Sequence, residues 1–387
     1  MSRTKVEYWE KWSGQEWQAM ASLVQAFNAE QEAYEVVMTP TGDRFASPDL
    51  GRFLRAQGEG APPDLVGLED HHLADLADQG GLAPLDRLVA PPLVRAAGFR
   101  EAFLELGRHD ELLCGLPIAT DIVTLYANQE SLVGTRFEGG SVPPDIDAFD
   151  EGLEELRRRG QIGLVPTYPG WWPQAWPWLF GGGWFDEAGR FAPDQPANVR
   201  AYEWVASFRK RWDLSEFAEP IQPIGSRKPD PFLSGRVAFV LEGDWLVQRL
   251  VTQLDFDWTP APIPTARGKP AALLVADLLC IPTGARSPEG AASFLSFLLE
   301  PERIERLALG QTKISPLVSW SSGFLAAHTN PRLTTLREIL DSAVLFHDPR
   351  VPGWLAVLER IQEAFGLIWS GKDSPSSVLA RLSSGRR

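Results

Sequence analysis

The chain has 387 residues, with 37 basic and 51 acidic side chains and a formal net charge of −14 when histidine is neutral. Hydrophobic residues make up 44% and charged residues 23%, which is typical of globular proteins, so global disorder is excluded and two or three folding units are expected. The negative charge repels phosphate backbones and anionic headgroups, which excludes nucleic acid and acidic membrane surfaces as favoured partners.

The N-terminus runs directly into a strand-like alternation and lacks the apolar segment of a signal peptide. The chain is therefore either cytoplasmic or the mature part of an exported protein. The longest mostly apolar stretch, residues 271–282, is interrupted by Asp277 and is shorter than the ~20 residues that span a bilayer. Cys114 and Cys280 lie in apolar surroundings without metal-type spacing, which predicts two buried free thiols.

Strand-like and helical segments alternate in the first part of the chain. Period-2 or short apolar runs predict strands, and apolar residues at helical spacing predict helices. The expected strands cover residues 5–9, 34–39 and 64–68, and the expected helices cover residues 15–30 and 72–79. This order predicts an α/β layer with a mostly parallel sheet.

The same pattern continues toward the C-terminus. Strands are expected at residues 122–127, 237–241 and 273–281. Helices are expected after Pro143-Pro144-Asp145 and at residues 198–212, 288–299 and 354–368. Several prolines in and around residues 258–266 favour an extended connector over a helix there.

Several short motifs follow one another in a fixed order along almost the whole chain. They are Phe27-Asn28 with Val36-Val37; Pro63-Asp64-Leu65-Val66 with Leu73-Ala74-Asp75-Leu76, Gly80-Gly81-Leu82 and Pro84-Leu85-Asp86; Gly115-Leu116-Pro117 with Leu125-Tyr126-Ala127-Asn128; Phe232-Leu233-Ser234-Gly235-Arg236-Val237-Ala238-Phe239 with Gly243-Asp244-Trp245; and Ile281-Pro282 with Pro288-Glu289-Gly290-Ala291-Ala292 and Phe294-Leu295-Ser296-Phe297-Leu298. Each motif alone is common, but their shared order is difficult to obtain by chance.

In these motifs the chain resembles the extracellular solute-binding proteins of sugar ABC importers (family 1), the group that includes maltose-binding protein. Two positions depart from the pattern: Ala127 stands where a second aromatic residue is usual, and Ile146-Asp147 stand where a Thr-Trp pair often occurs. The resemblance implies an α/β, two-lobe periplasmic-binding-protein fold (type II) with a hinge and a ligand cleft between the lobes. It also implies a periplasmic or extracellular protein, anchored as a lipoprotein in some relatives.

The function implied by the resemblance is binding without catalysis. The protein is expected to bind a mono- or oligosaccharide, to close about its hinge, and to deliver the sugar to the permease subunits of an ABC transporter. A monomer is expected, with no cofactor and no metal. The lobes are predicted at residues 1–117 plus 277–315 and at residues 121–272 plus 320–387, with hinge crossings near residues 118–121, 272–277 and 315–320.

Tryptophans are the first group of candidate ligand-binding residues. Five lie between Trp171 and Trp184 in a loop whose prolines prevent them from forming one helical stripe, so some must face a cleft or a partner. An indole can stack on the C–H face of a sugar while its N–H serves a hydroxyl. The candidates are Trp12, Trp171, Trp172, Trp245 and Trp354. Packing in a core is the alternative for the tryptophans of the loop and for Trp245, and packing against the second lobe is the alternative for Trp354.

Carboxylates are the second group, because each can accept hydrogen bonds from adjacent sugar hydroxyls. Glu69 and Asp70 follow a predicted strand, where open α/β sheets bind ligands. Asp121 lies at the first predicted hinge crossing. Asp277 interrupts an apolar strand, so a ligand hydroxyl or an arginine is expected to pair with it. Structural salt bridges are the alternative for all four.

Three other interpretations of the sequence remain: a metal site, a glycoside hydrolase and a carrier of a different cargo. His71-His72 could indicate a metal, but adjacent helical residues diverge and no third ligand is close in sequence, so a solvated or rim position is expected. A glycoside hydrolase would also use aromatic platforms and paired carboxylates. The same fold could carry a polyamine, iron or an amino-sugar phosphate, although the few scattered tyrosines argue against iron and no basic nest for phosphate is evident.

Overall fold

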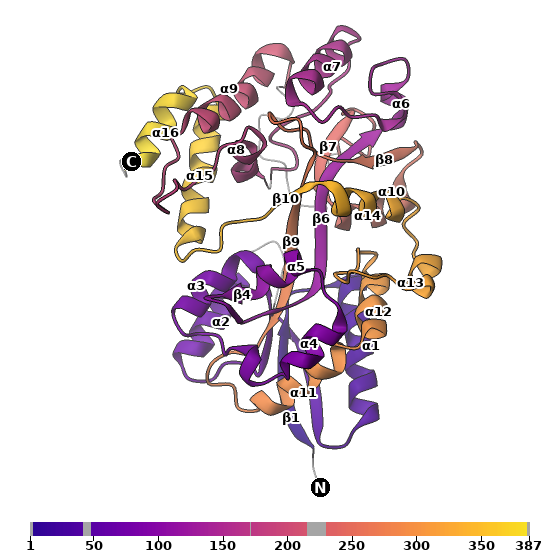
Figure 1. The fold of residues 1–387 in the computed structure, drawn as a ribbon, viewed down its shortest axis with the longest axis vertical. Helices are drawn as coiled ribbons and strands as arrows, with labels where there is room; N and C mark the ends of the chain where they lie inside the picture. Colours follow the sequence, from indigo (N-terminus) through magenta and orange to yellow (C-terminus); the bar gives the residue numbers. More distant parts are fainter. Residues whose placement is uncertain (1–2, 42–47, 171, 215–229, 385–387) are drawn as a thin grey trace. The chain divides into compact units, whose positions relative to one another are not determined.

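The computed structural model describes residues 3–41, 48–170, 172–214 and 230–384 (Figure 1). The chain divides into two compact units, each built from three chain segments. Unit 1 comprises Met1–Asp121, Leu274–Leu333 and His347–Leu355, and unit 2 comprises Ile122–Leu273, Thr334–Phe346 and Ala356–Arg387. The predicted lobes differ from these units near the C-terminus, because residues 320–333 and 347–355 belong to unit 1.

Unit 1 is built on a sheet whose strands follow the order β2-β1-β3-β9. Strands β1 (Thr4–Glu10), β2 (Tyr34–Pro40) and β3 (Leu65–Glu69) pair in parallel, and β9 (Ala271–Cys280) runs antiparallel to β3. Alternation along β1 buries Val6 and Tyr8 completely. The ends of β1 and β3, together with Asp277 on β9, therefore come to one region of this sheet.

Helices cover this sheet and close the core of unit 1. Helix α1 (Gly14–Glu30) lies beside α12 (Pro301–Gln311), and α11 (Pro288–Leu298) packs on β1 (Figure 1). Phe27 on α1 and Phe294 on α11 meet edge to face with ring centroids 5.2 Å apart. The remaining elements of the unit are α2 (Pro48–Gly58), α3 (Leu73–Asp78), α4 (Pro91–Ala97), α5 (Glu101–Leu104), β4 (Arg108–His109), β5 (Leu112–Leu113) and α13 (Ser322–Ala327).

Phe294 is expected to be a major contributor to the stability of unit 1. Its ring is fully buried and contacts Tyr8, Phe27 and Phe297. Phe294→Ala should lower the free energy of unfolding by about 3–5 kcal/mol, since it removes apolar contacts and leaves a cavity. Urea unfolding followed by circular dichroism measures this loss. Leu93→Ala, at a position on α4 that is 45% exposed, is the control and should change stability by less than about 1 kcal/mol.

Unit 2 contains β7 (Phe239–Gly243) and β8 (Trp258–Ala261), which both pair antiparallel with β6 (Leu116–Asn128), and β10 (Val344–Phe346), which pairs in parallel with β9. The prediction of a mostly parallel sheet is therefore wrong for this unit. Buried strands carry apolar side chains on both faces, so their pattern does not encode strand direction. The predicted connector at 258–266 is extended, and its first residues form β8.

Aromatic side chains form the core of unit 2. Phe137, Phe149 on α7 (Ile146–Arg158) and Phe239 on β7 contact one another with centroids 5.1–5.5 Å apart. Gly152 on α7 lies against the Phe137 ring, where a Cβ would overlap it. Helix α9 (Pro196–Arg211) packs on α8 (Trp176–Leu179) and α16 (Pro375–Ser383). The other helices are α6 (Gln129–Leu132), α10 (Val247–Gln253), α14 (Leu333–Ser342) and α15 (Trp354–Trp369), whose first two residues belong to unit 1.

Two further predictions concern membranes and thiols. Within the described ranges, no helix is both long enough and apolar enough to cross a bilayer. Cys114 and Cys280 are both buried and free, as predicted.

Candidate functional site

Charged side chains gather in unit 1 around the end of β1. We call Lys11, Glu16, Glu69, Asp121, Asp277 and Lys313 the ionic cluster. Lys11 follows β1 directly, and its Nζ lies 2.6 Å from Glu69 Oε1 and 2.5 Å from Asp277 Oδ1. Burial alone lowers the pKa of Lys11, but these two carboxylates outweigh burial and raise it above the usual value. Lys11 therefore stays charged and links β3 to β9.

The second lysine of the ionic cluster is almost completely enclosed. Lys313 follows α12 and is 3% exposed, and its Nζ lies 2.9 Å from Asp121, 3.4 Å from Glu16 and 3.8 Å from Asp277. Burial lowers the pKa of Lys313, but the three carboxylates raise it above its usual value. Burial raises the pKa of Asp277, but Lys11 and Lys313 bring it below the usual value. Within the described part of the chain, Lys11 and Lys313 pair with Asp277, where a ligand hydroxyl or an arginine was predicted.

Four of the predicted site residues meet in or beside this cluster. Trp12 is buried and its Nε1 donates a 2.9 Å hydrogen bond to Asp277 Oδ2. Glu69 and Asp277 share Lys11, and Asp121 pairs with Lys313. The side chain of Glu69 is 40% exposed, so it presents a carboxylate to solvent, whereas Asp121 is enclosed.

Asp70 and Trp354 are the other predicted residues of unit 1 that the structure describes, and they take no part in the ion pairs named above. Asp70 begins the short 3-10 turn η1 (Asp70–His72) and is buried. Burial raises its pKa well above the usual value, and Asp348 adds to the shift, while a main-chain hydrogen bond at Ala276 opposes it. Trp354 begins α15 in unit 1 and is fully buried. Trp171 lies outside the described residues.

Two tryptophans stack on each other in unit 2, and we call them the tryptophan pair. Trp172 precedes the 3-10 turn η5 (Pro173–Ala175), and Trp245 lies in η7 (Asp244–Leu246), directly after β7. Their ring centroids are 6.1 Å apart with an interplanar angle of 29°, and both side chains are half-buried. The Nε1 of Trp172 is buried and has no hydrogen-bond partner among the described residues. The pair therefore offers aromatic surface and, within the part of the chain that the structure describes, an indole N–H without an acceptor.

Local sequence places Trp245 in this position. Gly243 lies under the Trp245 ring, where a Cβ would overlap the ring atoms. Asp244 accepts a 3.0 Å hydrogen bond from the Ile122 main chain, which holds η7 against β6. These two contacts explain why glycine and aspartate precede the aromatic residue in the Gly243-Asp244-Trp245 motif.

A buried acid lies next to the tryptophan pair. Glu242 accepts a 3.0 Å hydrogen bond from the Gly243 main chain. Burial raises the pKa of Glu242 to about 8, because it outweighs the hydrogen bonds from Gly243 and the Trp245 side chain, and Asp230 adds to the increase. Glu242 thus titrates near neutral pH beside an aromatic ring.

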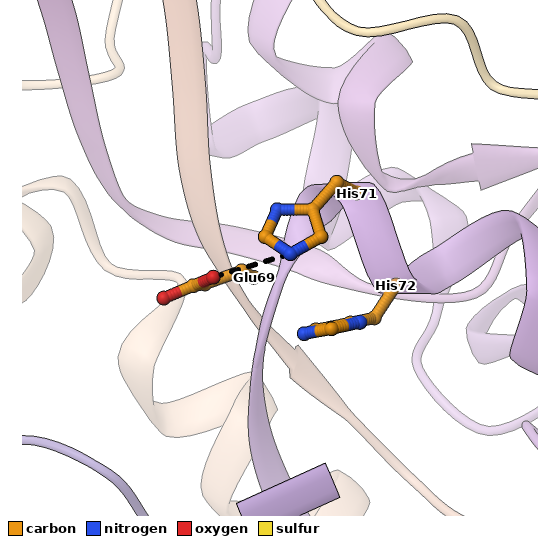
Figure 2. Close-up of side chains that lie close together, drawn as sticks. All are labelled: Glu69, His71 and His72. Carbon is orange, nitrogen blue, oxygen red and sulfur yellow. Dashed lines mark ion pairs between the residues drawn. The ribbon is translucent and has the colours of Figure 1, made fainter. Parts of the chain in front are cut away.

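Glu69, His71 and His72 form a group with potential metal-ligand atoms within 4.8 Å of one another (Figure 2). The two imidazole centroids are 4.1 Å apart, and His71 Nε2 lies 3.3 Å from Glu69 Oε2. The expectation that the histidines diverge without a third ligand is therefore wrong, because the 3-10 turn brings both rings beside Glu69. Burial lowers the pKa of His72 to about 3, with His71 adding to the shift, so His72 is neutral.

The Lys11 ammonium argues against a metal ion at Glu69, His71 and His72. It forms its 2.6 Å ion pair with the same Glu69 carboxylate that a metal would use, so a positive charge already stands among the donor atoms. A divalent cation would have to overcome this repulsion or displace Lys11 from Glu69. We therefore assign Glu69 to the ionic cluster and His71 to its rim.

Comparison with known proteins identifies the family. The sequence matches the bacterial extracellular solute-binding proteins over residues 22–319. The chain therefore belongs to this family, and the resemblance seen in the motifs is confirmed. The family is one of extracellular proteins, as the resemblance implied. A comparison with curated proteins found no match.

Solved structures share the fold over nearly the whole chain. CpMnBP1 with mannobiose bound aligns at a TM-score of 0.82 and 23% identity, covering 99% of both chains. The cyclic α-maltosyl-1,6-maltose binding protein from Arthrobacter globiformis aligns at 0.80 and 19%, covering 99% of this chain and 97% of that one. UgpB from Mycobacterium tuberculosis in complex with glycerophosphocholine aligns at 0.77 and 18%, covering 98% and 97%. The predicted fold class, the two-lobe α/β fold of solute-binding proteins, is confirmed.

Four charged residues in or near these groups are missing from the sequence-based prediction. One is Glu16, which lies in the first turn of α1, a common place for an acid in a helix. Lys11 stands between Glu10 and Trp12, where only its position after a strand could have singled it out. Lys313 lies in a turn after α12 and carries no local signal, because its partner Asp121 is distant in sequence. Glu242 precedes the predicted Gly243-Asp244-Trp245 motif, and its place in an apolar strand was the available signal.

Proposed function

We propose that the protein binds a mono- or oligosaccharide and delivers it to the permease of an ABC importer. The observation that carries this proposal is the tryptophan pair. Two half-buried indoles, one with a buried N–H that has no partner among the described residues, match the combination of C–H faces and hydroxyls on a sugar. Solved relatives of this fold include proteins with mannobiose and mannotriose bound.

The ionic cluster supports the same ligand class. Its lysines are already paired with carboxylates, so the cluster has little positive charge to offer an anionic cargo. A neutral polyol can add hydrogen bonds to the partly exposed Glu69 carboxylate without disturbing that balance. This argues for carbohydrate over the phosphate-containing cargo of the UgpB complex.

The proposal has further parts. The protein acts without catalysis and as a monomer outside the cytoplasmic membrane, either free or held there by a lipid anchor. Closure of two lobes about the predicted hinge would make recognition by the permease depend on bound sugar. A glycoside hydrolase is the competing function, and release of new reducing ends from an oligosaccharide would support it.

Ligand binding is tested by a fluorescence titration. Mannobiose, mannotriose, maltose and larger maltooligosaccharides are added to the purified protein, with glycerophosphocholine as the non-sugar comparison. At least one sugar is expected to quench tryptophan fluorescence with a Kd of about 10 μM or tighter and to raise the melting temperature. Binding of glycerophosphocholine with no response to any sugar would refute the carbohydrate assignment.

A further inference from the structure

A buried glutamate is hydrogen-bonded to the main chain of the ionic cluster but forms none of the ion pairs that define the cluster. Glu10 is the last residue of β1 and is 1% exposed. Its Oε1 accepts main-chain hydrogen bonds from Lys11 N at 2.7 Å and from Trp12 N at 3.3 Å. Its Oε2 accepts a hydrogen bond from the Tyr8 hydroxyl. One carboxylate thus receives three donors in the interior of unit 1.

The strand next to β1 leaves room for this carboxylate. Gly67 on β3 lies against it, and a Cβ at Gly67 would overlap both Glu10 oxygens. Every side chain larger than hydrogen at this position would therefore push the carboxylate away from its donors. The space at Gly67 and the three hydrogen bonds together fix one position for the Glu10 side chain.

Glu10 holds the main chain of the two residues whose side chains reach the Asp277 carboxylate. The Lys11 ammonium joins Glu69 to Asp277, and the Trp12 indole donates to Asp277. A change in the hydrogen bonds to the main chain of Lys11 and Trp12 would therefore move both side chains. We propose that Glu10 is a positioning residue for carbohydrate binding, and that its ionised form holds Lys11 and Trp12 in the geometry that binds sugar with higher affinity. This inference rests on the proposed function.

The charges around Glu10 explain why it can change its protonation state. Burial raises the pKa of Glu10 to about 7; the Tyr8 hydrogen bond lowers it, Asp277 raises it, and Lys11 lowers it. Burial, followed by Glu10 itself, raises the pKa of Tyr8 well above its usual value, so Tyr8 remains a donor. Hydrogen bonds to an ionised acceptor are roughly twice as strong as neutral ones, so protonation loosens the main chain of Lys11 and Trp12.

The direction of the pH effect follows from this preference. If sugar favours ionised Glu10, affinity rises as pH increases through about 7, and bound sugar lowers the pKa of Glu10. The free energy of unfolding changes in the opposite direction. Folding raises the pKa of Glu10, so the contribution of Glu10 to stability is lost as pH rises from the pKa of the unfolded chain to the pKa of the folded chain. Glu242 in unit 2 also titrates near neutral pH, so a pH profile of the unmodified protein does not identify the group.

The test uses the full chain and the isosteric variant Glu10→Gln, which can still accept the two main-chain hydrogen bonds but cannot ionise. Sugar affinity is measured by calorimetry from pH 6 to pH 8, with Glu242→Gln in parallel and Glu35→Gln, an exposed acid on β2, as the matched control. In the unmodified chain and in Glu35→Gln, Kd is expected to fall by about fivefold over this range. Glu10→Gln should bind sugar with the weaker affinity at both pH 6 and pH 8. Glu242→Gln should retain the part of the pH dependence of Kd that is due to Glu10.

A second measurement needs no sugar and so separates this inference from the proposed function. Main-chain amide resonances of Lys11 and Trp12 are followed by NMR between pH 5 and pH 9. A shared transition near pH 7 that disappears in Glu10→Gln supports the positioning role even if no sugar binds. If these amides do not titrate, or if Glu10→Gln keeps the full pH profile of sugar affinity, the inference is overturned.

Discussion

Replacing Lys313 with methionine is expected to lower the free energy of unfolding by about 3–5 kcal/mol. Lys313 is buried and its ammonium is paired with Asp121 and Glu16. Removing it leaves these carboxylates in the interior without their countercharge. Urea unfolding at pH 7 measures the loss, and Lys372→Met, at an exposed position, should be nearly neutral.

Two further measurements separate loss of charge from loss of packing. Adding Asp121→Asn to Lys313→Met should recover a large part of the stability, since the unpaired charge is removed with its partner. The deficit of the single variant should also shrink as pH falls, because burial already raises the pKa of Asp121 and loss of Lys313 raises it further. A deficit that is independent of both pH and Asp121→Asn would show that the methionine side chain simply packs badly.

Replacing Trp245 with alanine is expected to weaken sugar binding by about 30-fold, corresponding to about 2 kcal/mol of lost ring contact. Trp172→Ala should have a similar effect, because the two rings stack. The double variant should lose less than the sum of the single losses, since each ring supports the other. Calorimetric titration with the best sugar from the panel measures all three values.

Phenylalanine variants distinguish stacking from hydrogen bonding at the same positions. Trp172→Phe keeps a ring but removes the N–H that has no partner among the described residues, so an intermediate loss is expected. Trp204→Phe is the matched control, because Trp204 is also half-buried in unit 2 but its Nε1 already donates to Asp150 at 2.7 Å. Equal losses for Trp204→Phe and Trp172→Phe would contradict a direct role of the tryptophan pair.

Element types were predicted well where side chains alternate or repeat with helical spacing. Helix α1 and strands β1 and β2 match their predicted ranges closely, because their apolar residues recur with the period of the element. Strand β6 is longer than predicted: it begins at Leu116, before the Thr120-Asp121 pair that interrupts the apolar run. Pro117 is compatible with a strand only because it lies at its start, which a local pattern cannot establish.

The sequence identified some residues of the candidate site and missed their partners. Glu69 and Asp277 could be found because acids at a strand end or inside an apolar strand are unusual. Their partners could not be found, since Lys313 reaches Asp121 from a turn far along the chain. The contact between Trp172 and Trp245 likewise depends on how two separate turns meet, although both tryptophans were candidates. Sequence patterns identify groups that need partners, and tertiary structure supplies the partners.

The order of chain segments in unit 1 has a consequence for biosynthesis. Strand β3 has β1 on one side and the Asp277–Cys280 part of β9 on the other. A ribosome makes the whole of Ile122–Leu273 before those residues of β9 emerge. The nascent chain therefore carries an open sheet edge for most of its translation, a state in which polypeptides readily aggregate. Shielding of that edge until the late segment is available would lower the risk of aggregation.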